Sequence, residues 1–233
     1  MIRYFIIAGA FSLAAAPALA AVPPPTYDWT GGHVGVHLGY AWGHEDWNQT
    51  YSSLALALDY AAKPVEPDGV AAGIQAGYDH QFNQWVLGVG GDWTWTDLKA
   101  SRGHEVFPSY AGRSNTDWTG TLTARAGGAF ARSLFYVTGG AAFEHEASLI
   151  TFDGVQTSDE PGVTRTGWTV GVGMETALPR NWSLGLEYQH MGFGTHEAVF
   201  TYTAHPAGLV EDWKLKTDID VVKLRLNYRF PAH

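Results

Sequence analysis

Residues 220–230 read Asp-Val-Val-Lys-Leu-Arg-Leu-Asn-Tyr-Arg-Phe, and their pattern is the starting point for the fold. Apolar residues alternate with polar ones at Val222, Leu224, Leu226, Tyr228 and Phe230. A period of two places the two sets on opposite faces of a β-strand. In a soluble protein the apolar face would pack on a core, whereas in a transmembrane barrel it would face lipid. One strand does not decide between these readings.

The composition narrows the class of protein. The chain has 233 residues, 28 Gly, no Cys and a formal charge of −9. The negative charge argues against a nucleic-acid partner. The lack of Cys excludes disulfides and thiolate metal sites.

The N-terminus predicts export. Arg3 precedes an apolar run over residues 4–16, and Ala18-Leu19-Ala20 supplies a small-x-small cleavage pattern. These features predict a signal peptide over residues 1–20. The apolar run is too short for a comfortable transmembrane helix, and no later run is long enough either. We expect a linker over residues 21–31 and one barrel domain over residues 32–233.

The pattern of the opening stretch recurs seven times. The other predicted strands cover residues 32–42, 69–82, 85–95, 118–130, 135–143, 168–178 and 182–189. Long segments (43–68, 98–115, 144–163 and 191–217) alternate with short turns at 83–84, 131–133 and 179–181. Such alternation is typical of outer-membrane barrels. The sequence therefore predicts an all-β fold, an eight-stranded antiparallel up-and-down transmembrane β-barrel with short periplasmic turns and four long extracellular loops.

Aromatic residues support the membrane reading. They fall near one rim at Tyr78, Phe82, Trp85, Phe135, Trp182, Tyr228 and Phe230, and near the other at Tyr40, Trp42, Trp93, Trp95, Trp118, Phe143 and Trp168. Two aromatic girdles around an aliphatic band are expected at membrane interfaces. A lipocalin-like barrel would instead need an apolar interior, but here the enclosed face is small and polar.

Three motifs carry a family resemblance. These are Tyr27-Asp28-Trp29-Thr30-Gly31, Tyr136-Val137-Thr138-Gly139-Gly140 and Leu226-Asn227-Tyr228-Arg229-Phe230. The chain resembles the small porin-like barrels of Gram-negative bacteria, in particular the outer-membrane immunogenic proteins, with the architecture of the OmpA transmembrane barrel. The resemblance implies a location in the outer membrane, with lipid, lipopolysaccharide and the barrel-assembly machinery as partners. Such barrels commonly end on an aromatic residue, whereas here Pro231-Ala232-His233 follow Phe230.

The interior face carries a predicted charge layer. Counting from the strand ends places five residues at similar depth, namely Arg125, Glu175, Glu187, Lys223 and Arg225. We expect Glu175 and Glu187 to pair with Lys223 and Arg225, because unpaired charges in a confined interior are costly. The layer is either a structural polar plug or a salt-bridge gate that rearranges to open a narrow path.

His-Glu dipeptides begin at His44, His104, His145 and His196, one in each long segment. Imidazole and carboxylate together suit a divalent metal, and the resemblance implies hemin binding in some similar barrels. The alternative is that these are solvated loop residues or members of ion pairs at the rim.

No enzyme motif is present: the zinc-protease helix, nucleophile elbow and phosphate-binding loops are all absent. We expect no catalytic residues and no resident cofactor. The expected role is a structural, surface-exposed barrel, with passage of small solutes or rim binding of hemin or metal as further options.

Titration with zinc and with hemin tests the rim hypothesis. If the four histidines form a site, isothermal titration gives binding heat that is lost when all four are replaced by Ala. Heat that is absent, or unchanged in the fourfold variant, ends the hypothesis.

Overall fold

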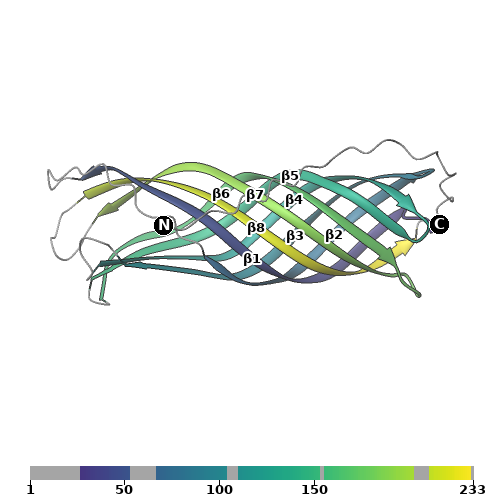
Figure 1. Ribbon diagram of the computed structural model, residues 1–233, viewed down its shortest axis with the longest axis horizontal. Helices are drawn as coiled ribbons and strands as arrows, with labels where there is room; N and C mark the ends of the chain where they lie inside the picture. The colour runs from purple at the N-terminus through teal and green to yellow at the C-terminus, as the bar shows by residue number, and fades with distance from the viewer. Residues whose placement is uncertain (1–26, 53–66, 104–109, 153–154, 202–209, 232–233) are drawn as a thin grey trace, which may run out of the picture.

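The computed structural model describes residues 27–52, 67–103, 110–152, 155–201 and 210–231, so residues 1–20 and most of 21–31 lie outside the described part. Eight strands follow in order: β1 (Gly31–Ser52), β2 (Asp68–Phe82), β3 (Trp85–Gly103), β4 (Tyr110–Phe130), β5 (Ser133–Phe152), β6 (Val155–Ala177), β7 (Trp182–Thr201) and β8 (Val210–Pro231). Each pairs antiparallel with its sequence neighbour, and β8 closes the barrel against β1 (Figure 1). The predicted eight-stranded antiparallel up-and-down barrel is confirmed.

The period-two pattern sorts side chains between the outside and the lumen. On β8, Leu224 is 53% exposed on the outer face, whereas Lys223 is 1% exposed inside. The same alternation holds on β1, where Val36 and Leu38 point outward and His37 is buried. Among the described residues no helix is long and apolar enough to cross a membrane.

The outward apolar surface forms a band of membrane thickness. On β8 it runs from Phe230 to Val222, and Asp220 is the first carboxylate above it. The ten residue steps between Phe230 and Asp220, at about 3.4 Å each and tilted by about 40°, span about 25 Å. Exposed aromatic side chains lie at both rims, including Trp85 and Trp182 at one and Trp42 and Trp168 at the other.

The two ends of the barrel differ. At the end that we call the turn end, short connections join β2 to β3, β4 to β5 and β6 to β7, as the sequence predicted. Asn83 and Ala131 adopt positive φ angles of 55° and 52° there, which tight turns require. The opposite end, which we call the loop end, carries the remaining connections.

The strands at the loop end are much longer than predicted. Segments 43–68, 98–115, 144–163 and 191–217 were expected to be loops, yet β1 continues to Ser52 and β6 begins at Val155. The sequence in these parts mixes polar and apolar residues, because neither face meets lipid there. Without that contrast the alternation that revealed the lower strands is lost.

An apolar cluster closes the lumen at the turn end. Trp29, just before β1, is fully buried with Val86, Ala129, Leu134, Tyr136 and Ala177. Its backbone N–H donates to Gln81 Oε1 at 2.8 Å, and its carbonyl accepts from Arg229 Nη2 at 2.7 Å. The Arg229 guanidinium lies 4.8 Å from the Trp29 ring centre. Trp29, a residue of the expected linker, therefore packs inside the barrel and closes its turn end.

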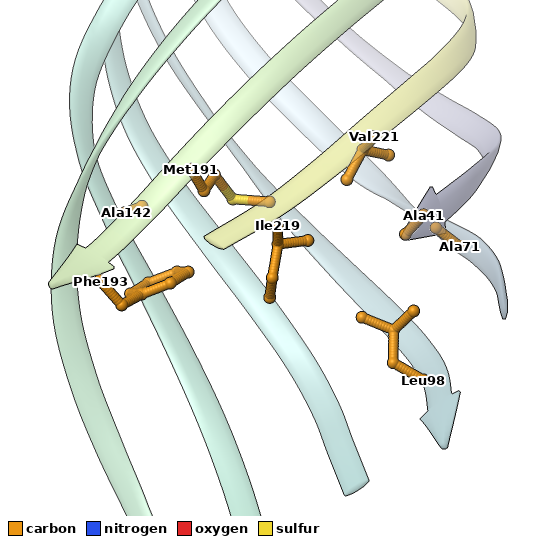
Figure 2. Close-up of a cluster of buried hydrophobic side chains, with 8 residues drawn as sticks. All are labelled: Ala41, Ala71, Leu98, Ala142, Met191, Phe193, Ile219 and Val221. Carbon is orange, nitrogen blue, oxygen red and sulfur yellow. The ribbon is translucent and has the colours of Figure 1, made fainter. Parts of the chain in front are cut away.

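A second apolar cluster fills the lumen at the loop end (Figure 2). It contains Ala41, Ala71, Leu98, Ala142, Met191, Phe193, Ile219 and Val221. These residues lie at and above the upper edge of the outward band, where water rather than lipid surrounds the strands. An apolar core inside is then the way to stabilise the extension.

Replacing Trp29 by Ala tests whether its packing inside the lumen stabilises the barrel. Removing a buried Trp side chain should lower the unfolding free energy by about 3 kcal/mol. Urea titration in lipid vesicles, followed by electrophoretic mobility of the folded barrel, measures the loss. The matched control is Trp85→Ala, because Trp85 is 62% exposed on the outer surface. A loss no larger than the control's would show that Trp29 is not structural.

Candidate functional site

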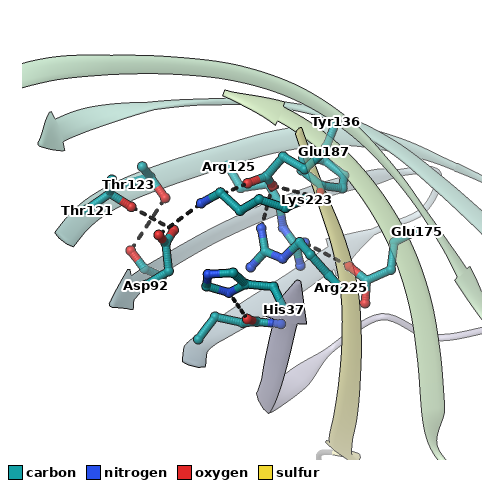
Figure 3. A network of polar contacts seen from close by, with 12 residues as sticks. His37, Asp92, Thr121, Thr123, Arg125, Tyr136, Glu175, Glu187, Lys223 and Arg225 are labelled. Carbon is teal, nitrogen blue, oxygen red and sulfur yellow. Dashed lines mark hydrogen bonds and ion pairs between the residues drawn. The ribbon is translucent and has the colours of Figure 1, made fainter. Parts of the chain in front are cut away.

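A layer of charged side chains fills the barrel between the two apolar clusters, and Figure 3 shows part of it. We call it the lumen network, and it consists of Asp79, Asp92, Glu175, Glu187, Arg125, Lys223, Arg225 and Arg229. Each of these side chains is at most 11% exposed. Four carboxylates balance four cations, so the network is formally neutral.

The lower half of the network joins opposite walls of the barrel. Arg125 of β4 donates from Nε to Asp79 Oδ1 at 3.0 Å and from Nη1 to Glu175 Oε2 at 3.0 Å. Arg229 of β8 donates to Asp79 Oδ2 at 2.6 Å and to Glu175 Oε1 at 3.3 Å. In a ring of eight strands β2 lies opposite β6, and β4 opposite β8. Two arginines and two carboxylates therefore tie four walls together.

The upper half joins β3, β5, β7 and β8. Lys223 Nζ lies 2.9 Å from Asp92 Oδ1 and 3.9 Å from Glu187 Oε1. Glu187 also pairs with Arg225 and accepts a hydrogen bond from the Tyr136 hydroxyl at 2.8 Å. The Tyr136 ring lies under Arg125, 4.8 Å from the guanidinium carbon, and so links the two halves.

Neutral polar groups surround the charges. His37 of β1 contacts Gln75 Oε1 through Nδ1 at 2.6 Å and Thr94 Oγ1 through Nε2 at 3.0 Å. Gln75 donates to Asn227 Oδ1 at 2.8 Å, and Asn227 donates to Glu175 Oε1 at 3.1 Å. The hydrogen-bond chain thus runs from β3 through β1 and β2 to β8 and β6.

Glycines make room for these long side chains. A Cβ at Gly88 would lie 2.1 Å from Asp79 Oδ1, and one at Gly173 would lie 2.5 Å from Tyr136 Cζ. Any side chain at either position would displace a member of the packed interior. The small residues of the lumen face are therefore part of the site.

All five residues of the predicted charge layer lie inside the barrel, but the pairing differs in part. Glu187 contacts Lys223 and Arg225 as expected. Glu175 contacts Arg125 and Arg229 instead. The reason is that both partners reach Glu175 across the lumen, from β4 and β8, neither of which is adjacent to β6.

The sequence argument left out three members of the network, Asp79, Asp92 and Arg229. All three share the lumen face with the predicted residues, so the alternation contains the signal. The two arginine partners of Asp79 lie on β4 and β8, neither of which is adjacent to β2. Pairing across the lumen could not be read from one strand and its neighbours.

The four His-Glu histidines do not form a common site in the described residues. His44 of β1 is exposed and lies 3.5 Å from Asp46, while His145 of β5 stacks on Trp118 with ring centres 5.8 Å apart. Only the backbone of His196 is described, and His104 lies outside the described residues. Within the described part, no three His, Asp or Glu side chains could hold a metal ion. Rim binding of hemin or metal stays a prediction.

Comparison with known proteins agrees with this geometry. The model of a family described as "Outer membrane protein beta-barrel domain" matches residues 6–230. The chain belongs to this family. The 31 kDa outer-membrane immunogenic protein of Brucella melitensis is 31% identical over 226 residues, which are 90% of this chain and 87% of the relative. A 25 kDa outer-membrane immunogenic protein of Brucella abortus is 31% identical over 171 residues, 73% of this chain and 68% of the relative.

The fold has a counterpart among solved structures. The outer membrane protein OprG from Pseudomonas aeruginosa superposes with a TM-score of 0.57 at 11% identity, covering 88% of this chain and 99% of that one. At this identity the likeness concerns the fold alone. Family membership and the barrel together establish an outer-membrane protein related to surface immunogens, and neither the family description nor the names of these relatives indicates an enzyme.

Replacing Glu175 by Gln tests whether the ion pairs across the lumen stabilise the barrel. The change leaves two buried arginines short of a counter-charge, and we expect an unfolding free energy lower by about 3 kcal/mol. The control is Glu197→Gln, because the Glu197–Lys214 pair at 3.7 Å is exposed and should contribute little. Urea titration of both variants in vesicles gives the comparison, and equal stability of the two would refute the structural role of Glu175.

Proposed function

We propose that this protein is a closed outer-membrane barrel whose role is structural and surface-presenting, with a lumen that stays shut to freely diffusing solutes. The observation that carries this proposal is the filling of the lumen. Three layers follow one another along the barrel axis. They are the apolar cluster around Trp29 at the turn end (the Trp29 cluster), the lumen network, and the apolar cluster around Phe193 at the loop end (the Phe193 cluster). Eight strands enclose a space that side chains can just fill.

The orientation that goes with this role puts the turn end in the periplasm. An even number of strands leaves both termini at the same end, where an exported N-terminus stays. The loop end then faces outward, and strands that continue beyond the membrane band present a long β-sheet surface to the surroundings. This arrangement supports surface exposure of the kind implied by the names of the Brucella relatives.

A narrow conduit for small ions or solutes is the second candidate. The contact that favours it is the one between Lys223 Nζ and Glu187 Oε1, which at 3.9 Å is the longest ion pair in the network. Movement of Lys223 away from Glu187, while it stays with Asp92, would change the charge lining the upper lumen. Such a path would require the Phe193 cluster to rearrange as well.

Planar-bilayer recording decides between the two candidates. The closed barrel predicts that the purified, refolded protein produces no stable, large unitary steps. If a small conductance exists, Glu187→Ala should alter it more than Glu197→Ala, because Glu187 lies in the lumen and Glu197 on the outside. Large, stable steps from the unmodified protein would overturn the closed-barrel proposal.

A further inference from the structure

Above the membrane band the barrel splits into two sheets. Pairing between β6 and β7 runs from the turn end only as far as Trp168 and Gly192, and pairing between β1 and β2 stops at Trp42 and Asp68. Beyond those points β7, β8 and β1 stay together, while β3, β4, β5 and β6 form the other sheet. Figure 1 shows these as two separate prongs at the left end of the barrel. We call them the β7–β8–β1 prong and the β3–β6 prong.

The split between β6 and β7 has a local cause. Gly194 has a φ of +70°, and the register of β7 against β8 shifts between Gly192 and Thr195. Positive φ and a β-bulge both bend a strand away from its previous direction. From Phe193 to Thr201, β7 therefore keeps β8 on one side and has no strand partner on the other among the described residues.

The two edges that face this split are not equivalent. The free part of β6, residues 155–167, contains Asp159, Glu160 and Pro161. Charged residues and Pro are devices that prevent an edge from pairing with another chain, since Pro has no N–H to donate. The free part of β7 contains no Pro and ends in Val199-Phe200-Thr201, all residues that favour strands. Its one acidic residue, Glu197, already contacts Lys214 of β8.

We propose that the free edge of β7, Thr195–Thr201, binds an extended segment of another polypeptide by strand addition. The backbone of the incoming segment would supply the hydrogen bonds, and its side chains would alternate between the two faces of the prong. The β7–β8–β1 prong carries six acidic and two basic residues over 43–52, 193–201 and 210–219. Its formal charge of −4 favours a segment that is basic and rich in β-branched residues.

A second copy of this chain fits the edge poorly. Two copies in one membrane, both with the same end outward, are related by an axis along the membrane normal. Such an axis sets their β7 strands parallel to each other, and parallel pairing is the less stable arrangement. Two prongs of charge −4 would also repel each other. An incoming peptide has no such restriction and can pair antiparallel.

Fluorescence anisotropy of a labelled peptide on the refolded, full-length protein tests the proposal. The probe is the heptapeptide Lys-Thr-Val-Lys-Val-Thr-Lys, and its control carries N-methyl groups on alternate residues, which removes the donors on one edge. We expect the probe to bind and the methylated peptide to bind at least about tenfold more weakly, because strand addition depends on backbone hydrogen bonds. Equal binding of both peptides overturns strand addition.

Two matched variants locate the site. Val199→Lys introduces an edge-blocking charge on β7 and should weaken binding of the probe about tenfold. Val163→Lys makes the same change on the β6 edge and should leave binding within about twofold. Electrophoretic mobility checks that both variants fold, and the methylated peptide on the unmodified protein remains decisive if one does not. Equal effects of the two variants would mean that binding follows net charge and not the β7 edge.

Two further measurements distinguish peptide binding at the β7 edge from self-association of the chain and from a reversed orientation in the membrane. Sedimentation in detergent that reveals a dimer abolished by Val199→Lys would assign the edge to a second copy and overturn the proposal. The outward position of the edge rests on the proposed orientation, whereas binding to the purified protein does not. Probe binding to purified protein but not to intact cells would therefore contradict the orientation and leave strand addition in place.

Discussion

The structure depends on ion pairs that cross the lumen. Arg125 and Arg229 each contact both Asp79 and Glu175, and these four residues come from β4, β8, β2 and β6. Backbone hydrogen bonds in a barrel connect only neighbouring strands, so they resist flattening of the ring weakly. Charged side chains that reach across the interior fix the distance between opposite walls. The glycines that face them, such as Gly88 and Gly173, are required for the same reason.

The distribution of apolar side chains follows from what surrounds each level of the barrel. Within the membrane band the outer face is apolar and the lumen polar, which is the reverse of a soluble protein. At the loop end the pattern reverts, and Leu98, Met191, Phe193 and Ile219 lie inside. One chain thus contains two solvent environments along the same strands. The change occurs on β8 between Val222 and Asp220.

Alternation in the sequence was sufficient to predict eight strands, their faces and the closure of β8 on β1. It succeeded because lipid and lumen impose opposite demands on successive residues. It failed where that contrast ends, so that the continuation of β1 to Ser52 and of β6 from Val155 was taken for loop. The alternation could not predict the partners of Glu175 or the burial of Trp29, because both depend on contacts across the lumen. It did predict the pairing of Glu187 with Arg225, because these residues lie on adjacent strands.

The Trp29 cluster and the lumen network lie well below the prongs, and the apolar cluster of Phe193 and Ile219 separates them from the prong tips. Substitutions in distant, unconnected regions have nearly additive effects on stability. The prongs can therefore accumulate substitutions while the membrane-embedded part keeps its stability. The surface at the loop end can therefore change in sequence at little cost to the stability of the barrel.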